Sequence, residues 1–356
     1  MINQEANGRF EKGRGAQFNP KNRFLKGAYV QEHTEAIDDW EEEERKTEYI
    51  FDNSKTLVNE VKSPDVGMMY SANPYQGCEH GCIYCYARNS HEYWGYSAGL
   101  DFERKIIVKR NAPELLRKFL TRSGWECQPL SISGNTDCYQ PAERKYGITR
   151  KLIEVCQEFN QPLGIITKNA GVLRDADLLA DMASRKLASV LMSINSLNED
   201  LRRKMEPRTT TAAQRMRVIR ELSNKGVHTG VMIGPVIPGL NDHEIPSILE
   251  QAAEAGARFA AYTFVRLNGA VKLIFHQWLM EQYPDRANKV WHSIEHGHGG
   301  QVNDSRFGKR MRGEGQQAEI INQQFKKFSR LYGMNAERWS LDTSRFCVPG
   351  QQLKLF

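Results

Sequence analysis

Three cysteines within eight residues are the clearest chemical feature of this sequence. Cys78, Cys82 and Cys85 have the spacing C-x3-C-x2-C, and Gly77 and Gly81 lie beside them. Thiolates at this spacing can hold three corners of one iron–sulfur cubane, and the glycines allow the backbone to bend around it. A structural zinc site prefers four ligands, commonly two C-x2-C pairs, and no second pair follows in the sequence. Three thiolates leave one iron of a 4Fe–4S cluster open to a reactive ligand.

The aromatic residue Tyr84 extends the motif to C-x3-C-x-aromatic-C, which resembles the signature of the radical S-adenosylmethionine superfamily. The segments Cys-x-Tyr-Cys-Tyr-Ala-Arg (82–88) and Thr-Asp-x-Tyr-Gln-Pro-x-Glu (136–143) are further similar to a bacterial radical-SAM family of largely unassigned activity. That family is itself similar to spore photoproduct lyase. The resemblance covers about residues 10–356 for the unassigned family and about 68–265 for the lyase.

This resemblance implies a partial (β/α)6 barrel with a 4Fe–4S cluster in the loop after the first strand. S-adenosylmethionine would bind the open iron and be cleaved to methionine and a 5′-deoxyadenosyl radical, which abstracts a substrate hydrogen. The resemblance also implies an electron donor such as flavodoxin or ferredoxin, and DNA as a candidate substrate, because the lyase repairs a thymine dimer in DNA. Such lyases use a cysteine as hydrogen donor, and Cys138 is the nearest candidate for that catalytic role.

Short apolar segments alternate with amphipathic stretches in the middle of the chain and must position these residues. The predicted strands are 68–72, 130–133, 163–167, 189–194, 229–233 and 259–264, and the predicted helices between them are 112–121, 147–159, 176–184, 212–225 and 244–255. This alternation predicts parallel βα units. Parallel strands need covered faces, which a full or partial barrel provides, although periodicity equally allows an open doubly wound sheet.

Polar residues follow several predicted strands, where functional groups collect in a parallel barrel. The residues that we expect to bind S-adenosylmethionine are Tyr84, Ser133, Asn135, Thr136, Asp137, Lys168, Ser193 and Asn195. The resemblance brings the end of the second strand, with Thr136 and Asp137, to the amino group of the cofactor. Lys168 could pair with its carboxylate, and Ser193 and Asn195 could face ribose hydroxyls. An alternative is that 135–137 form an ordinary turn before the next helix.

The ends of the chain differ from this middle part. Residues 1–46 carry a basic and then an acidic block without a hydrophobic period, which predicts a disordered arm or a basic arm that touches nucleic acid. We assign 47–275 to the barrel, 276–340 to a helical extension and 341–356 to a flexible tail. The tail residues Gln352, Leu353, Leu355 and Phe356 resemble the peptide with which replication and repair proteins bind the β sliding clamp. The other interpretation is that the tail folds back on the barrel.

Composition limits the class of protein. The longest apolar run is broken by glycine and proline, and the first thirty residues lack a secretory leader, so we expect a cytoplasmic protein without membrane contact. Seven cysteines favour metal or redox use over disulfides. The sequence thus predicts a radical S-adenosylmethionine enzyme of unassigned substrate. A non-catalytic 4Fe–4S electron carrier or redox sensor, whose fourth ligand would be Cys127, Cys138, Cys156 or Cys347, and a structural zinc module are the alternatives.

Overall fold

A computed structural model of the chain describes residues 10–25 and 46–350, and within them the main sheet has seven strands. These strands are β2 (Val58–Glu60), β3 (Tyr70–Ala72), β6 (Leu130–Ile132), β7 (Leu163–Thr167), β8 (Ala188–Ser193), β9 (His228–Val236) and β10 (Phe259–Phe264). Their order is β10-β9-β8-β7-β6-β3-β2, in which β3 to β10 are parallel and β2 is an antiparallel edge. The predicted strands match the parallel ones within a few residues.

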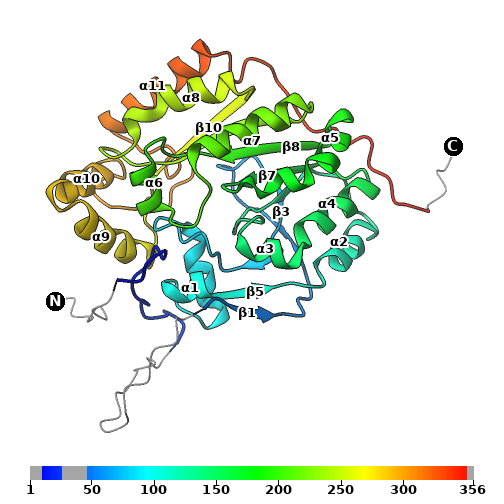
Figure 1. Cartoon of the computed structure of the whole chain (residues 1–356), viewed down its shortest axis with the longest axis horizontal. Coiled ribbons are helices and arrows are strands. Elements are labelled where there is room, and N and C mark those ends of the chain that lie inside the picture. The colour runs from blue at the N-terminus through cyan, green and yellow to red at the C-terminus, as the bar shows by residue number, and fades with distance from the viewer. Residues whose placement is uncertain (1–9, 26–45, 351–356) are drawn as a thin grey trace, which may run out of the picture.

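Helices connect these strands and cover the sheet (Figure 1). They include α2 (Ala112–Leu120), α4 (Ile148–Glu158), α5 (Ala176–Ser184), α7 (Ala212–Asn224) and α8 (Ile245–Glu254). Gly226 and Gly256, which follow the ends of α7 and α8, have φ of +81° and +99°, the left-handed conformation that commonly ends a helix. The hydroxyl of Thr211 caps α7 by accepting from the Gln214 N–H. A parallel sheet covered by helices is the predicted partial radical-SAM barrel, which the structure confirms.

Several short elements were not predicted from the sequence. They are β1 (Glu48–Phe51), β4 (Tyr75–Gln76), β5 (Lys105–Val108), α1 (Leu100–Arg104), α3 (Pro141–Tyr146), α6 (Glu199–Met205) and the 3-10 helices η1 (Tyr86–Trp94), η2 (Ala170–Asp175) and η3 (Asp242–Glu244). Elements of two to nine residues are too short to establish a clear hydrophobic period. Strands β1, β4 and β5 form a second, smaller sheet, in which Tyr75 pairs with Val108. This small sheet supports the chain just before the three cysteines.

The C-terminal part is helical, as expected, with α9 (Val271–Gln282), α10 (Pro284–His296) and α11 (Gln316–Leu331). Helix α11 packs on α8 and β10. Between α10 and α11, residues 298–315, which we call the strap, contact both edges of the main sheet. The Phe264 N–H of β10 donates to the Met311 carbonyl (2.9 Å), and the Gly308 N–H donates to Asp65 in the hairpin between β2 and β3 (2.6 Å). The strap therefore bridges the open side of the partial barrel.

The N-terminal stretch is more ordered than its composition indicated. Residues 10–25, which lie within the predicted disordered arm, pack on the barrel, and Arg14 and Ala16 are buried. The N–H groups of Gly15 and Ala16 donate to the carboxylate of Glu103 (3.0 and 2.8 Å). A Cβ atom on Gly15 would lie 1.7 Å from the carbonyl oxygen of Gly81. The expectation of disorder is therefore wrong for 10–25, because a buried carboxylate and close backbone packing hold a segment that has little apolar surface.

The clamp-like residues Gln352, Leu353, Leu355 and Phe356 lie outside the described residues, so their role stays a prediction. Among the helices that the structure describes, none is both long and apolar enough to cross a membrane.

Candidate functional site

The three cysteines lie on a tightly held loop, residues 77–85, which we call the cysteine loop. Cys78 and Cys82 are buried, and Cys85 is half-buried. Gly77 has a φ of +79°, and a Cβ atom there would lie 2.8 Å from the Lys105 carbonyl oxygen, so only glycine fits without strain. The side chain of the fully buried Gln140 donates to the Gly77 carbonyl (3.0 Å) and accepts from the N–H of Glu79 (3.1 Å). The loop is therefore fixed before any cofactor binds.

A buried ion pair supports the cysteine loop from behind. Arg88, with no exposed surface, donates to the carbonyl oxygens of Cys82 (2.9 Å) and of Gly99 (3.0 Å). Its guanidinium also pairs with Glu103, which is equally buried. Because Glu103 is the same carboxylate that holds residues 15 and 16, one ion pair joins the cysteine loop, α1 and the N-terminal stretch.

The chemistry of the donor set fits a cluster with three thiolate ligands. Burial raises the pKa of all three thiols, while the positive charge of Arg88 opposes this effect for Cys82 and Cys85. Cluster binding would therefore displace protons from the loop. In the described ranges, no group of three or more His, Cys, Asp or Glu side chains converges closely enough for a single metal ion.

Three of the remaining cysteines, Cys127, Cys156 and Cys347, lie away from the cysteine loop. These three surround the turn before β7. The predicted cofactor residue Lys168 follows the other end of that strand. The Cys127 thiol contacts the Gln161 side chain (3.6 Å), and the backbone carbonyl of Cys156 accepts from the Gln161 N–H (2.8 Å). The Cys347 sulfur accepts from the Asn160 side chain (3.3 Å). The electron-carrier alternative needs a fourth thiolate near the cysteine loop, and this arrangement does not provide it.

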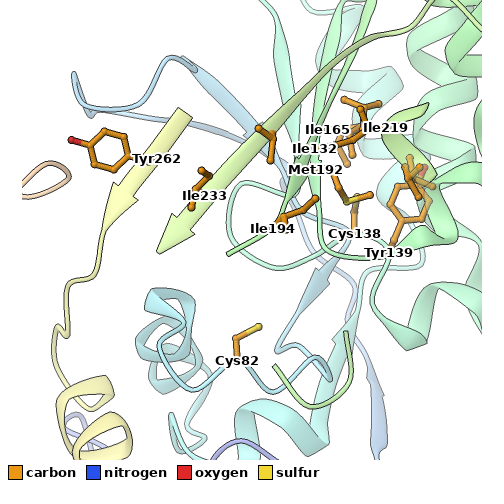
Figure 2. Close-up of a cluster of buried hydrophobic side chains, with 14 of the residues drawn as sticks. Cys82, Ile132, Cys138, Tyr139, Ile165, Met192, Ile194, Ile219, Ile233 and Tyr262 are labelled. Carbon is orange, nitrogen blue, oxygen red and sulfur yellow. The ribbon is translucent and has the colours of Figure 1, made fainter. Parts of the chain in front are cut away.

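Cys138, the candidate hydrogen donor, is fully buried in the hydrophobic core. Figure 2 shows it with Ile132, Tyr139 and Met192, while Cys82 lies on a separate loop. Burial raises the pKa of the Cys138 thiol well above its ordinary value. Cys82 and Tyr84 belong to the same buried cluster as Cys138. The role of Cys138 as hydrogen donor stays a prediction.

Several predicted cofactor residues meet in one buried network. It lies at the carboxyl ends of the parallel strands, which we call the rim. The Tyr84 hydroxyl hydrogen-bonds to the Glu206 carboxylate and accepts from the Asn195 amide (3.1 Å). The Lys168 ammonium donates to the Ser193 hydroxyl (3.1 Å). Four residues that the sequence placed after different strands, or in the motif, therefore lie close together.

Two charged residues of this network were not predicted. Glu206 and Arg215 form an almost fully buried ion pair (2.6 Å), and Arg215 also donates to the Ser193 carbonyl (2.7 Å). Burial by itself would raise the pKa of Glu206, but Arg215 and Lys168 outweigh it and lower that pKa. Burial would lower the pKa of Lys168, whereas Glu206 and Cys82 raise it, with a net increase. Both groups are therefore charged at neutral pH. Glu206 lies 122 positions from Tyr84 in the chain, so no local pattern indicated their contact.

The residues after β6 connect the end of this strand to neighbouring segments through hydrogen bonds. Ser133 has a φ of +82°, which is rare outside glycine, and its hydroxyl donates to the Thr136 carbonyl (2.8 Å). The Thr136 hydroxyl donates to the Tyr75 carbonyl (2.6 Å). The amide of Asn135 donates to Gln76 and to Ser90 (both 3.1 Å). These residues lie beside the cysteine loop, but their polar groups already have partners within the chain.

Asp137 joins β6 to β7. Its carboxylate accepts from the Thr167 hydroxyl (2.7 Å) and the Lys168 N–H (2.8 Å), and lies 3.4 Å from the His80 ring. Burial would raise the pKa of Asp137, but His80 and these donors lower it to about 2. The carboxylate is therefore ionised and internally bonded. Contact of Asp137 with S-adenosylmethionine remains a prediction.

Two cavities in the described parts of the chain, of about 390 and 360 Å³, lie away from these strand ends. The first is between α10 and α11, and the second separates residues 10–17 from α6 and α9. Neither contains a predicted cofactor residue.

Comparisons with known proteins agree with this fold and donor set. The model of the radical SAM superfamily matches residues 72–252. An uncharacterised protein of Mycobacterium tuberculosis is 32% identical over 238 residues, which cover 66% of this chain and 70% of that protein. A protein named radical SAM Nalpha-GlyT isomerase, from Pseudomonas phage M6, is 28% identical over 54% of this chain and 38% of that protein. The chain belongs to the radical SAM superfamily, whose members hold a 4Fe–4S cluster and S-adenosylmethionine.

The fold is also similar to a solved structure of spore photoproduct lyase complexed with dinucleoside spore photoproduct. The TM-score is 0.59 at 16% identity, with 80% of each chain covered. At this identity the likeness shows the shared fold. The protein is thus a radical SAM enzyme whose substrate the comparisons do not identify.

Proposed function

We propose that this radical SAM enzyme abstracts a hydrogen atom from a nucleotide of DNA. The observation that carries the proposal is the basic strap beside the rim. Residues 306–312 read Arg-Phe-Gly-Lys-Arg-Met-Arg, and Phe307 is 57% exposed among these cations. Cations with an exposed aromatic ring suit a phosphate backbone and its bases.

A solved structure with the same fold supports this substrate class. It is that of spore photoproduct lyase complexed with dinucleoside spore photoproduct. The strap contacts β10 at one edge of the sheet and the β2–β3 hairpin at the other, so a chain lying on the strap would face the open side of the barrel. The narrower proposal of thymine-dimer repair depends on a hydrogen donor such as Cys138, whose role stays a prediction.

When bound, the cluster and S-adenosylmethionine supply the radical that removes a substrate hydrogen, at the expense of one electron from a donor such as flavodoxin or ferredoxin. We assign Cys78, Cys82 and Cys85 to the cluster. Lys168, held in its charged form above Tyr84, would bind the carboxylate of S-adenosylmethionine. Ser193 and Asn195 would meet its ribose hydroxyls, and the rim formed by Ser133, Asn135, Thr136 and Asp137 would orient its amino group.

The rest of the chain orients these groups and excludes water. The cysteine loop is anchored by Gln140 and Arg88, and Glu206 with Arg215 fixes the ring of Tyr84 next to it. A network with buried, paired charges keeps its geometry when the cofactor binds, which limits the reorganisation that the reaction would otherwise need.

The test is isotope transfer from DNA. The reconstituted enzyme is reduced without oxygen and incubated with S-adenosylmethionine and oligonucleotides that carry deuterium on their sugars and bases. We expect deuterium in the 5′-deoxyadenosine that forms. If 5′-deoxyadenosine forms at the same rate with and without DNA and carries no deuterium, the substrate proposal is wrong while the assignment to the superfamily stands. Matched RNA in place of DNA distinguishes the two polymers.

A further inference from the structure

Arg266 is a cation near the rim, and the neighbouring carboxylate of Asp65 is already bonded to Arg310. It comes two residues after β10 and is half-buried. Among the described residues, no hydrogen bond or salt bridge reaches its guanidinium. Burial and the nearby positive charge of Arg310 lower the pKa of Arg266, while the charge of Asp65 opposes this effect. A partly desolvated guanidinium next to a second cation is costly unless an anion pairs with it.

Two arginines of the strap, Arg306 and Arg310, differ from Arg266 because they have partners within the fold. Arg310 pairs with Asp65 and donates to Ser63 (2.5 Å) in the β2–β3 hairpin. Arg306 pairs with Asp304 (2.6 Å). Arg306 and Arg310 thus pair their charges within the fold, while Arg266 does not.

Unpartnered polar atoms of other residues lie in the same region. His298, which is 4% exposed, has an Nδ1 without a partner, while its Nε2 contacts the Val265 carbonyl (2.7 Å). Asn268 and Asn303 each have a buried side-chain oxygen without a partner. The Leu267 N–H donates to the Val302 carbonyl (2.9 Å), which brings these segments together. Buried polar groups normally find partners, so several orphans beside one unpaired cation indicate a missing ligand.

This region adjoins the cysteine loop. Helix η1, which follows the loop, is joined to the chain after Arg266. The amide of Asn89 donates to the Asn268 carbonyl (2.9 Å) and accepts from the Ala270 N–H (3.0 Å). A group bound to Arg266 would therefore be held at a fixed place relative to the cluster.

We propose that Arg266 binds a backbone phosphate of the DNA substrate and thereby sets which nucleotide faces the cysteine loop. The planar guanidinium presents paired N–H groups that suit the oxygens of a phosphate. His298 and the two asparagines add polar contacts around the same nucleotide. Arg266 is a substrate-positioning residue that is separate from the cofactor network of Lys168 and Glu206. This inference rests on the proposed function.

The experiment measures DNA binding by Arg266→Gln. The reconstituted protein, without S-adenosylmethionine, is titrated into fluorescein-labelled single-stranded DNA of mixed sequence, and anisotropy is followed at several salt concentrations. Loss of one phosphate contact should weaken binding about tenfold or more. It should also make the slope of log affinity against log salt shallower by about 0.7. Arg266→Lys should restore the slope but only part of the affinity, because lysine keeps the charge without the planar fork.

Controls separate the possible failures. Arg220 is exposed on α7, away from the strap, and Arg220→Gln should leave affinity and slope unchanged. Formation of 5′-deoxyadenosine without DNA should be equal in the wild type and Arg266→Gln, which shows that the cofactor site is intact. Normal DNA binding by the wild type with an equal slope for Arg266→Gln would overturn the inference and leave the proposed function standing. No DNA binding by the wild type would overturn both.

Discussion

The arginine behind the cysteine loop is paired within the protein, whereas the arginine after β10 is not. Arg88, behind the cysteine loop, is completely buried, and its donors are used by carbonyl oxygens and by Glu103. Arg266, beside the strap, is half-buried and has no internal partner among the described residues. The charged groups of the cofactor region are therefore paired within the chain, and the proposed substrate region leaves charge for a molecule that binds and leaves.

This difference follows from what each region has to do. A loop that holds a cluster must keep its geometry, so its supports are buried and paired before loading. A substrate site must release its ligand, and a cation already paired within the protein attracts a phosphate less strongly than one without a partner. The predictions below test the two halves of this comparison.

The largest effect should come from the cysteine loop itself. Replacing Cys82 by alanine removes one of three thiolates, and we expect loss of the cluster and of all 5′-deoxyadenosine formation. Iron content, the visible spectrum and the anaerobic assay measure this. Cys347→Ala is the matched control, because Cys347 is exposed and lies near the turn before β7. Cluster loss in Cys347→Ala would show that this cysteine is a ligand and would reopen the electron-carrier alternative.

The second effect concerns the paired charge behind the loop. Glu103→Gln leaves Arg88 buried without an anion and presents an N–H donor group to the N–H groups of residues 15 and 16. Breaking a buried pair should lower the free energy of unfolding by about 3–5 kcal/mol. Urea unfolding of the apo-protein measures it.

The control for Glu103→Gln is another ion pair of the same chain. Glu158→Gln breaks the exposed pair with Arg117, whose side chains are 40% and 45% accessible, and should cost about 0–1 kcal/mol. Equal effects of the two variants would mean that the pair behind the cysteine loop is no more important than a surface pair.

A third prediction concerns the N-terminal stretch. A Cβ on Gly15 would collide with the carbonyl oxygen of Gly81, so Gly15→Ala should detach residues 13–17 from the cysteine loop. We expect about 1–3 kcal/mol less local stability, seen as faster amide hydrogen exchange in this stretch. Faster bleaching of the cluster in air should accompany it. Gly67→Ala, where nothing lies within 4 Å of the added Cβ, should change neither rate. Unchanged exchange in Gly15→Ala would show that the stretch is not anchored there.

The smallest effect should be a pH dependence of the strap. Arg306 lowers the pKa of Asp304 from 3.8 to about 2 through a side-chain hydrogen bond. A carboxyl group whose pKa is lower in the folded state stabilises the protein above its unfolded pKa, and this contribution disappears as the pH falls through the folded value. Asp304→Asn should therefore unfold at lower urea than the wild type at pH 7, and the difference should shrink between about pH 4 and 2. A difference that does not change with pH would exclude this ion pair as its cause.

Sequence periodicity was sufficient for the parallel strands, because each is a run of apolar residues followed by an amphipathic helix. The cysteine spacing predicted the cluster ligands, and the strand ends predicted Lys168, Ser193 and Asn195 as cofactor residues. The structure places Lys168 beside Ser193 and Asn195 beside Tyr84. Glu206 and Arg215 were missed because their contacts depend on tertiary structure, far along the chain from Tyr84. The composition of residues 10–25 indicated disorder, since a count of apolar residues does not register a carboxylate such as Glu103 that binds backbone N–H groups. No sequence pattern indicated Arg266, because it is a single arginine after a strand.

The strap also determines when the barrel can close during synthesis. Its contact between Gly308 and Asp65 joins residues that are 243 positions apart. At about 5–20 residues per second, the ribosome needs roughly 12–50 s to make that length of chain. Arg88 and Glu103, by contrast, are only 15 positions apart. On the nascent chain the support of the cysteine loop can therefore assemble early, whereas β10 and the hairpin remain without the strap until late in translation.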